Sequence, residues 1–199
     1  MRAPLLYLPL LLACWPLMAL GGAQIYEPLA DSVRGRLSRM VADRAPATLH
    51  CRSSTDAQRW IDEMERRLER RIPDRQRRLE LLRAVHYEAL RARLDPQLVL
   101  GLIEVESGFR KYAVSRAGAR GYMQVMPFWV KLVGHPGHNL FHLRTNLAYG
   151  CAILRHYLDM EKGDYFRALG RYNGSLGKPD YPSRVLAAWK GRWSYDGQT

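Results

Sequence analysis

Residues 95–108 constrain the fold most strongly, because they have the pattern of one complete, buried helix. Asp95-Pro96 supplies a capping side chain and a proline suited to the first helical turn, and Gly108 supplies a stop. Apolar residues recur between these ends at helical spacing and share one face: Leu98, Leu102 and Val105. The sequence therefore predicts a core helix that has two glutamates near its C-terminal end.

These two glutamates are Glu104 and Glu106. Residues two positions apart on an α-helix point about 200° apart, so the two carboxylates cannot act together on one bond. The partial negative charge at a helix C-terminus tends to raise the pKa of Glu106. If its side chain is also buried, it stays protonated near neutral pH and can serve as a general acid. The alternative is an ordinary ion pair with Arg110 or Lys111.

Three further helical segments are expected before this helix. The first ends before Pro46, the second ends before Pro73, and Asp74 caps the third. Their apolar positions are Leu29, Val33, Leu37 and Val41, then Trp60, Met64 and Leu68, then Leu79, Leu82, Leu90 and Leu94. Residues 24–92 are therefore expected to form a helical N-terminal extension.

The chain is basic, since 31 Lys+Arg against 19 Asp+Glu give a formal net charge of +12, and only five of these basic residues are lysines. Residues 52–93 contain many arginines but also many acids, several at helical spacing, such as Glu63 with Arg67 and Asp74 with Arg78. This pattern favours a solvated, self-paired helix surface over a clamp for a polyanion. A basic surface attracts nucleic acid, anionic lipid or an acidic wall polymer, and charge alone does not choose among them.

The N-terminus indicates the compartment. Arg2 precedes an uncharged apolar run at residues 3–20, and small residues follow up to Ala23. This is the pattern of a secretory signal peptide, so we expect residues 1–23 to be removed and the protein to act in the periplasm. An uncleaved membrane anchor is disfavoured because Pro9 and Pro16 interrupt the run, and lipoprotein cleavage before Cys14 is disfavoured by the leucine near the cut. Export makes nucleic acid an improbable partner, whereas peripheral association with the cell envelope is compatible with export. No protein partner is indicated.

The cysteines are consistent with export. Cys14 would leave with the signal peptide, and the pair Cys51 and Cys151 would remain. In an oxidising compartment an even pair favours a disulfide, and two buried free thiols are the alternative.

Neither a metal nor a cofactor is indicated. Three histidines surround a Pro-Gly loop without a supporting carboxylate pattern: His135, His138 and His142. The chain has no phosphate-binding glycine-rich loop and no nucleophile elbow. No metal site and no cofactor are therefore expected.

An ordered set of motifs carries the functional signal. The motifs are Glu106-Ser107, Gly121-Tyr122-Met123-Gln124 with Pro127, Asn146-Leu147, Arg171-Tyr172-Asn173-Gly174 and Tyr181. This set resembles the soluble lytic transglycosylase family, whose hallmark is Glu-Ser followed by Gly-Leu-Met-Gln and then Pro. The resemblance covers residues 93–190. Tyr122 stands where the family usually has leucine, and Arg171 where it usually has alanine.

The resemblance implies an all-α, lysozyme-like domain, here placed at residues 93–193, with a groove for the glycan strands of peptidoglycan. It implies cleavage of the β-1,4 bond between N-acetylmuramic acid (MurNAc) and N-acetylglucosamine (GlcNAc), leaving a 1,6-anhydroMurNAc end. Glu106 is then the catalytic acid and base. The substrate-binding roles fall to Ser107 on the muramoyl side, Met123 and Gln124 in the groove wall, Tyr172 and Asn173 beside Glu106, and Tyr181.

One carboxylate is enough for this reaction, whereas most glycosidases need two. Glu106 would protonate the leaving oxygen and then take the proton of the C6 hydroxyl, which attacks within the same sugar. A second carboxylate stays an open alternative, and its candidates are Asp159, Glu161 and Asp164.

Two rival functions follow from the same residues. A lysozyme-type muramidase would use water in place of the C6 hydroxyl. A non-catalytic peptidoglycan-binding envelope protein would keep the fold without the chemistry, and the intact Glu106-Ser107 and Met123-Gln124 disfavour it. Tyr112, Tyr122 and Phe128 are candidates for stacking on sugar rings, whereas Trp129 is expected in the core.

Overall fold

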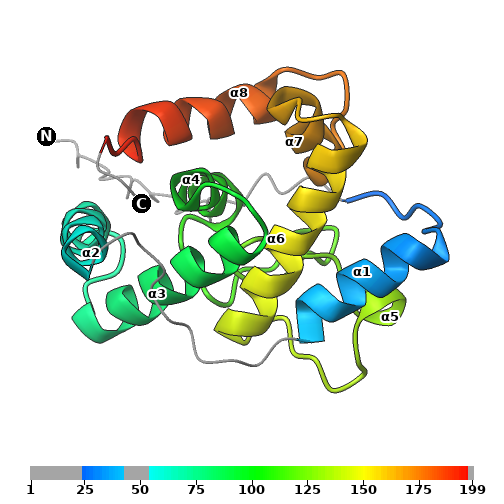
Figure 1. Ribbon diagram of the computed structural model, residues 1–199, viewed down its shortest axis with the longest axis horizontal. Helices are drawn as coiled ribbons and strands as arrows, with labels where there is room; N and C mark the ends of the chain where they lie inside the picture. Colours follow the sequence, from blue (N-terminus) through cyan, green and yellow to red (C-terminus); the bar gives the residue numbers. More distant parts are fainter. Residues whose placement is uncertain (1–23, 43–53, 197–199) are drawn as a thin grey trace, which may run out of the picture.

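The structure, a computed structural model, describes residues 24–42 and 54–196. Within these ranges the chain forms α-helices, one short π-helix and isolated β-bridges in the segment 114–125, which confirms the expected all-α class (Figure 1). The elements are α1 (Asp31–Ala42), α2 (Ser54–Leu68), α3 (Arg75–Arg91), α4 (Pro96–Ser107), α5 (Phe128–Val133), α6 (Leu143–Met160), α7 (Tyr165–Asn173), α8 (Asp180–Ala187) and η1 (Ala188–Arg192).

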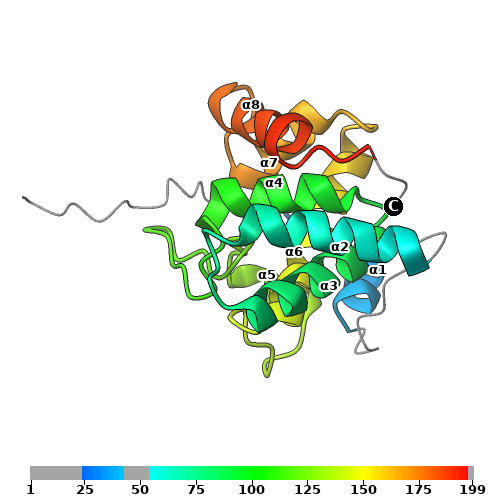
Figure 2. The same ribbon diagram turned by 90° about the vertical axis from the view of Figure 1, so that its left-hand side faces the viewer.

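Helix α4 is the predicted core helix, and its start and stop are those that the sequence predicts. Oδ1 of Asp95 accepts a hydrogen bond from the backbone N–H of Gln97 at 2.7 Å, and Gly108 ends the helix in the left-handed conformation with φ 57°. The helix lies between α7 and α8 on one side and α2 and α3 on the other (Figure 2). Most residues of α4 are buried, so this helix fixes the position of the residues at its C-terminal end.

Helices α2 and α3 belong to the same hydrophobic core as the rest of the described chain. The predicted apolar stripe of α2 is fully buried, with Trp60, Met64 and Leu68 each at 0% exposure. These residues form one cluster with side chains of α4, α6 and α8. The expected boundary at residue 93 therefore lies between two helices, α3 and α4, that pack on each other and share one core.

The C-terminal segment holds α4 through two tryptophans. Nε1 of Trp189 donates to Oδ2 of Asp95 at 2.8 Å, and Nε1 of Trp193 donates to Oε2 of Glu104 at 2.7 Å. Glu104 also forms ion pairs with Arg71 at 2.6 Å and with Arg192. Glu104 is thus a structural residue that joins the α2–α3 turn, α4 and the end of the chain.

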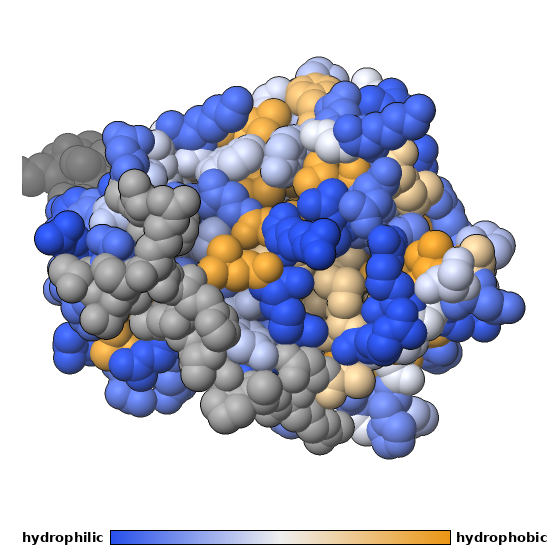
Figure 3. Space-filling view, in the orientation of Figure 1, coloured by the Kyte–Doolittle hydropathy of each residue, from blue (hydrophilic) through white to orange (hydrophobic). Residues whose placement is uncertain are grey.

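The arginine-rich surface is largely self-paired, as expected. Glu63 pairs with Arg67 at 2.6 Å, and its two arginine partners lower the pKa of Glu63 to about 2. The predicted pair of Asp74 with Arg78 is wrong. Arg78 is buried and donates to backbone carbonyls of the α2–α3 turn and to Glu65, because these acceptors lie on the inner side of α3. Hydrophilic residues cover much of the face shown in Figure 3, with hydrophobic patches between them.

Two expectations concern residues outside the described ranges. Residues 1–23, which contain the predicted signal peptide and Cys14, lie outside them, and so does Cys51. Cys151 is buried in α6 and its thiol is free. In the part of the chain that the structure describes, no helix is both long and apolar enough to cross a bilayer.

Candidate active site

Glu106 lies in the last turn of α4 and is only 2% exposed. The phenol of Tyr181, from α8, donates a hydrogen bond of 2.6 Å to its Oε1. Burial raises the pKa of Glu106 to about 8, while the hydrogen bond from Tyr181, the amide of Asn173 and the charge of Arg184 oppose this rise. A carboxyl group with such a pKa is largely protonated at neutral pH and can donate its proton.

Glu106 does not form the alternative ion pair with Arg110 or Lys111 in the described part of the chain. Nε of Arg110 donates instead to the backbone carbonyl of Ser107 at 2.9 Å. The groups that shift the pKa of Glu106 are Tyr181, Asn173 and Arg184, and none of them is a carboxylate. Glu106 is therefore a solitary acid held by a phenol.

Several polar atoms of this region are buried without a hydrogen-bond partner. Within the described residues they include Oε2 of Glu106, Nδ2 of Asn173 and Oε1 of Gln124. The Asn173 amide is near enough to lower the pKa of Glu106, although it forms no hydrogen bond of ordinary geometry. Most buried polar groups in proteins are paired, so a set of unpaired donors and acceptors is a recognised mark of a ligand site.

Tyr172 connects this acid to the segment that carries the Met-Gln motif. Its hydroxyl donates to the backbone carbonyl of Met123 at 2.7 Å, and the ring is 1% exposed. Burial and the nearby Glu106 raise the pKa of Tyr172 well above its usual value, so it stays a neutral donor. Consecutive residues at the end of α7 thus serve two neighbours: Tyr172 holds Met123, and Asn173 lies near Glu106.

The hydroxyl of Ser107 lies beside two backbone carbonyls. The side chain is 1% exposed, and the hydroxyl lies 2.7 Å from the carbonyl oxygen of Tyr122 and 3.1 Å from that of Ile103. A hydroxyl has one proton to donate, so Ser107 ties the Tyr122 backbone to α4. A hydrogen bond to a sugar would require it to leave these carbonyls or to accept.

Met123 forms the layer beneath the site rather than an open wall. Its side chain is 0% exposed and lies against Gly150 of α6, where an added Cβ would come within 2.3 Å of the sulfur. Its backbone N–H donates to Oδ1 of Asn146 at 2.8 Å. The Asn146 amide in turn donates to the carbonyls of Arg120 and Leu140, each at 2.8 Å, so this buried asparagine holds the whole loop.

Gln124 has an unusual backbone conformation, with φ 47°. Few residues other than glycine adopt this region, and such strain concentrates at functional sites. The side-chain amide holds the loop closed by donating to the carbonyls of Gly121 at 2.9 Å and Ala113 at 3.2 Å. Its Oε1 is left without a partner.

Gln24 is a site residue that sequence reasoning missed. It is 4% exposed, its Oε1 accepts from the backbone N–H of Met126 at 3.1 Å, and its Nε2 donates to the carbonyl of Gln124 at 3.4 Å. Close by, Glu27 pairs with Arg171 at 3.5 Å. Residues 24–27 therefore strap the Met-Gln segment to α7, and Arg171 gains a partner where the resembled family has alanine. No short-range pattern reveals contacts across about a hundred residues of sequence.

The three acids that were candidates for a second carboxylate are occupied elsewhere. Asp159 pairs with Arg36 at 2.9 Å and with Arg155 at 2.7 Å. Glu161 binds Arg167 and Arg171, which lower its pKa. Asp164 caps α7 by accepting from the backbone N–H of Arg167 at 3.0 Å.

The aromatic and histidine candidates divide between core and surface. Trp129 is 2% exposed and lies in the core, as expected, whereas Tyr112 is 71% exposed. Nδ1 of His138 lies 2.8 Å from the hydroxyl of Tyr149, and Nδ1 of His135 accepts from the backbone of its own loop. Within the described ranges no three His, Cys, Asp or Glu side chains are grouped as a metal site.

Comparisons with known proteins identify the family of the chain. Residues 83–182 match the family described as the transglycosylase SLT domain. A transglycosylase of Enterobacteria phage PRD1 is 35% identical over 100 residues, which are 47% of this chain and 37% of that protein. Membrane-bound lytic murein transglycosylase C of Histophilus somni (strain 2336) is 36% identical over 118 residues, covering 51% of this chain and 32% of that protein.

A shorter match has a higher identity. Membrane-bound lytic murein transglycosylase C of Actinobacillus pleuropneumoniae serotype 5b (strain L20) is 50% identical over 48 residues, which are 24% of this chain and 13% of that protein. The chain spans between 13% and 37% of the length of these curated relatives. The family match covers half of the chain, from the middle of α3 to the start of α8, and includes Glu106 with every motif around it. The chain belongs to the transglycosylase SLT domain family.

Proposed function

We propose that this protein is a peptidoglycan lytic transglycosylase that cleaves the β-1,4 bond between MurNAc and GlcNAc and leaves a 1,6-anhydroMurNAc end. The observation that carries this proposal is the solitary, buried Glu106, whose pKa burial raises to about 8. Glycosidases that use water or a covalent intermediate generally need a second carboxylate, and the three acids considered for that role are engaged in other contacts. Family membership supports the same reaction class.

The first step is proton donation. The Glu106 carboxyl gives its proton to the glycosidic oxygen, the bond from that oxygen to the anomeric carbon breaks, and GlcNAc departs with a new hydroxyl. Positive charge develops on the MurNAc ring, where the N-acetyl group of the substrate can shield it. The carboxylate that remains is stabilised by the hydrogen bond from Tyr181.

The second step closes the sugar. The C6 hydroxyl attacks the anomeric carbon, a new carbon–oxygen bond forms, and Glu106 recovers the proton of that hydroxyl. No water is consumed, and the acid returns to its starting form. An internal nucleophile has a high effective concentration, so the protein does not need a group that binds and activates a second reactant.

The neighbouring polar atoms are proposed to bind the substrate. The unpartnered Nδ2 of Asn173 suits a hydroxyl or carbonyl oxygen of the sugar, and the unpartnered Oε1 of Gln124 suits a hydroxyl or an N–H group. Tyr172, Met123 and Ser107 lie in the layer behind these atoms and position them. Tyr181 would act on the acid itself, by favouring its ionised form after the first proton transfer.

We further propose that the protein acts on the cell wall after export. The apolar run at residues 3–20 and the small residues up to Ala23 support cleavage of a signal peptide. Two of the relatives are named membrane-bound lytic murein transglycosylases. Location in the periplasm is tested by cell fractionation and by the mass of the exported chain.

Replacement of the acid tests the proposed function. Purified cell-wall sacculi should lose turbidity with the wild-type protein and not with Glu106→Gln, which keeps a similar size but has no proton to donate. Glu69→Gln is the matched control, because it makes the same chemical change at an exposed residue in the turn between α2 and α3. Full activity of the Glu106→Gln variant would overturn the assignment.

A further inference from the structure

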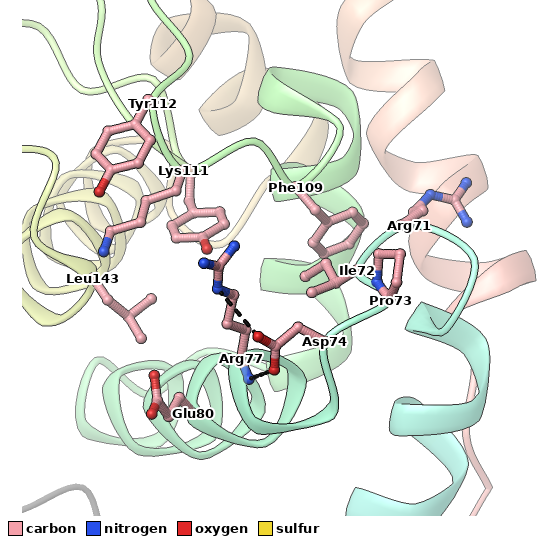
Figure 4. Close-up of a pocket in the computed structure, with 11 residues that line it drawn as sticks. Arg71, Ile72, Pro73, Asp74, Arg77, Glu80, Phe109, Lys111, Tyr112 and Leu143 are labelled. Carbon is pink, nitrogen blue, oxygen red and sulfur yellow. Dashed lines mark hydrogen bonds and ion pairs between the residues drawn. The ribbon is translucent and has the colours of Figure 1, made fainter.

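A cavity of about 380 Å³ opens between the α2–α3 turn and the segment that follows α4 (Figure 4). The side chains that matter for its chemistry are Ile72, Arg77, Phe109, Lys111, Tyr112 and Leu143. Glu106 does not line it. The cavity is therefore separate from the catalytic acid, although both flank the C-terminal end of α4.

The cavity holds two cations whose charge is weakly compensated. Arg77 extends into the middle of the space, and its contact with Asp74 is loose, at 3.5 Å between highly exposed groups (Figure 4). Lys111 has no carboxylate within ion-pair distance in the described part of the chain, and its Nζ lies 5.3 Å from the ring centre of Tyr112. Arg71, in contrast, turns its guanidinium away toward Glu104.

The floor beside these cations is apolar and aromatic. Phe109 and Ile72 face the cavity from one side and Leu143 from the other, and Tyr112 remains 71% exposed at the rim. An exposed aromatic ring beside Lys111 and the loosely paired Arg77 suits a ligand that has carboxylates joined by short apolar parts. Two acids also line the cavity. Asp74 contacts Arg77, and Glu80, at the edge, would accept hydrogen bonds from an amino group of the same ligand.

The cavity is close enough to the catalytic acid to receive a branch of the same substrate. Phe109 follows Glu106 by three residues, so their Cα atoms are no more than about 11 Å apart. In peptidoglycan the peptide stem is attached to the muramoyl sugar, whose bond is the one that is cut. A glycan strand bound at Glu106 therefore brings carboxylates and amino groups into this neighbourhood.

We propose that this cavity binds the peptide stem of peptidoglycan, with a stem carboxylate between Arg77 and Lys111. The inference rests on the proposed function, since it names a further part of the same substrate. One wall of the cavity, Arg71–Glu80, precedes residue 83, where the family match begins. The chain outside the family match thus gains a role in substrate choice.

The experiment compares two substrates in the same variants. Glycan strands with and without peptide stems are digested by the wild type, Arg77→Ala and Lys111→Ala, and KM is measured for both. Arg83→Ala and Lys131→Ala are the controls. Both residues are exposed, and each substitution removes one positive charge away from the cavity. The ratio of KM for peptide-free strands to KM for peptide-bearing strands should exceed one in the wild type. It should fall about twofold to fivefold in each cavity variant, the range of a partly exposed ionic contact. It should not change in the controls.

Outcomes separate the two proposals. Cleavage of both substrates with a ratio that is equal in all five proteins would overturn the inference and leave the proposed function standing. If neither substrate is cleaved, calorimetric binding of a soluble stem peptide tests the cavity directly. Binding that weakens in the cavity variants alone would support the cavity and count against the proposed function. Equal binding of a peptide-free polyanion of the same charge would indicate general anion attraction and overturn the inference.

Discussion

The phenol of Tyr181 donates a 2.6 Å hydrogen bond to Oε1 of Glu106 and thereby joins α8 to the last turn of α4. This bond favours the ionised carboxylate and so opposes burial, which nevertheless leaves the pKa of Glu106 raised to about 8. It therefore moderates the acid without neutralising the effect of burial.

Replacing Tyr181 by Phe should move the alkaline limit of activity upward. The hydrogen bond to the carboxylate is lost, so the pKa of Glu106 rises further and the protonated form persists to higher pH. The maximal rate should fall, because the carboxylate formed after proton donation is less stabilised. A pH profile of kcat/KM checks both effects. An unchanged alkaline limit would show that Tyr181 does not act on the acid.

Folding stability should depend on pH through Glu106. Its pKa is raised from 4.5 to about 8 on folding, so between these values the folded state binds more protons than the unfolded state. The free energy of unfolding should then fall as pH rises, by at most about 1.4 kcal/mol per pH unit from this one group. Glu106→Gln removes this contribution. Urea unfolding of both proteins from pH 4.5 to 8 should give a flatter curve for the variant, and parallel curves would contradict the raised pKa.

Gln24→Ala should weaken both stability and activity. It removes two hydrogen bonds and leaves the N–H of Met126 and the carbonyl of Gln124 without this partner, at a cost of about 1–3 kcal/mol in the free energy of unfolding. The Met-Gln segment should also become less well positioned, so kcat should fall more than KM rises. Ile25→Ala is the control, because Ile25 is 57% exposed. Equal kcat in the two variants would argue against a positioning role for the strap.

Gly150→Ala should disturb the layer beneath the site. An added Cβ would lie 2.3 Å from the Met123 sulfur, so the methionine must move or the helices must separate. Overpacking of this kind typically costs about 1–3 kcal/mol. The matched control is Gly191→Ala, where a Cβ meets nothing within 4 Å. Thermal unfolding should show a lower midpoint for Gly150→Ala only, and equal midpoints would mean that the contact relaxes freely.

The sequence was sufficient for features that depend on neighbouring residues. The cap at Asp95, the stop at Gly108 and the stripe Trp60, Met64 and Leu68 are local patterns, and the structure confirms them. The separation of Glu106 from Glu104 was also visible, because helical geometry points residues two positions apart in different directions. That Asp159, Glu161 and Asp164 have other partners was not.

Features that depend on distant contacts were not predictable. Asp74 and Arg78 have ideal helical spacing, yet the turn carbonyls and Glu65 compete successfully for Arg78. A signal for Gln24 would require knowing that residue 124 lies beside it. The burial of Ser107 and Met123 likewise follows from how the loop folds back on α4 and α6, which no spacing encodes.

The chemical form of the released sugar tests the central proposal most directly. Sacculi digested to completion with the wild-type protein should release muropeptides with 1,6-anhydroMurNAc ends, each lighter by one water than the corresponding reducing product. Mass spectrometry of the soluble fragments distinguishes the two forms. A population made of reducing MurNAc ends would contradict the account, because it would show that water, and not the C6 hydroxyl, attacks the sugar that Glu106 activates.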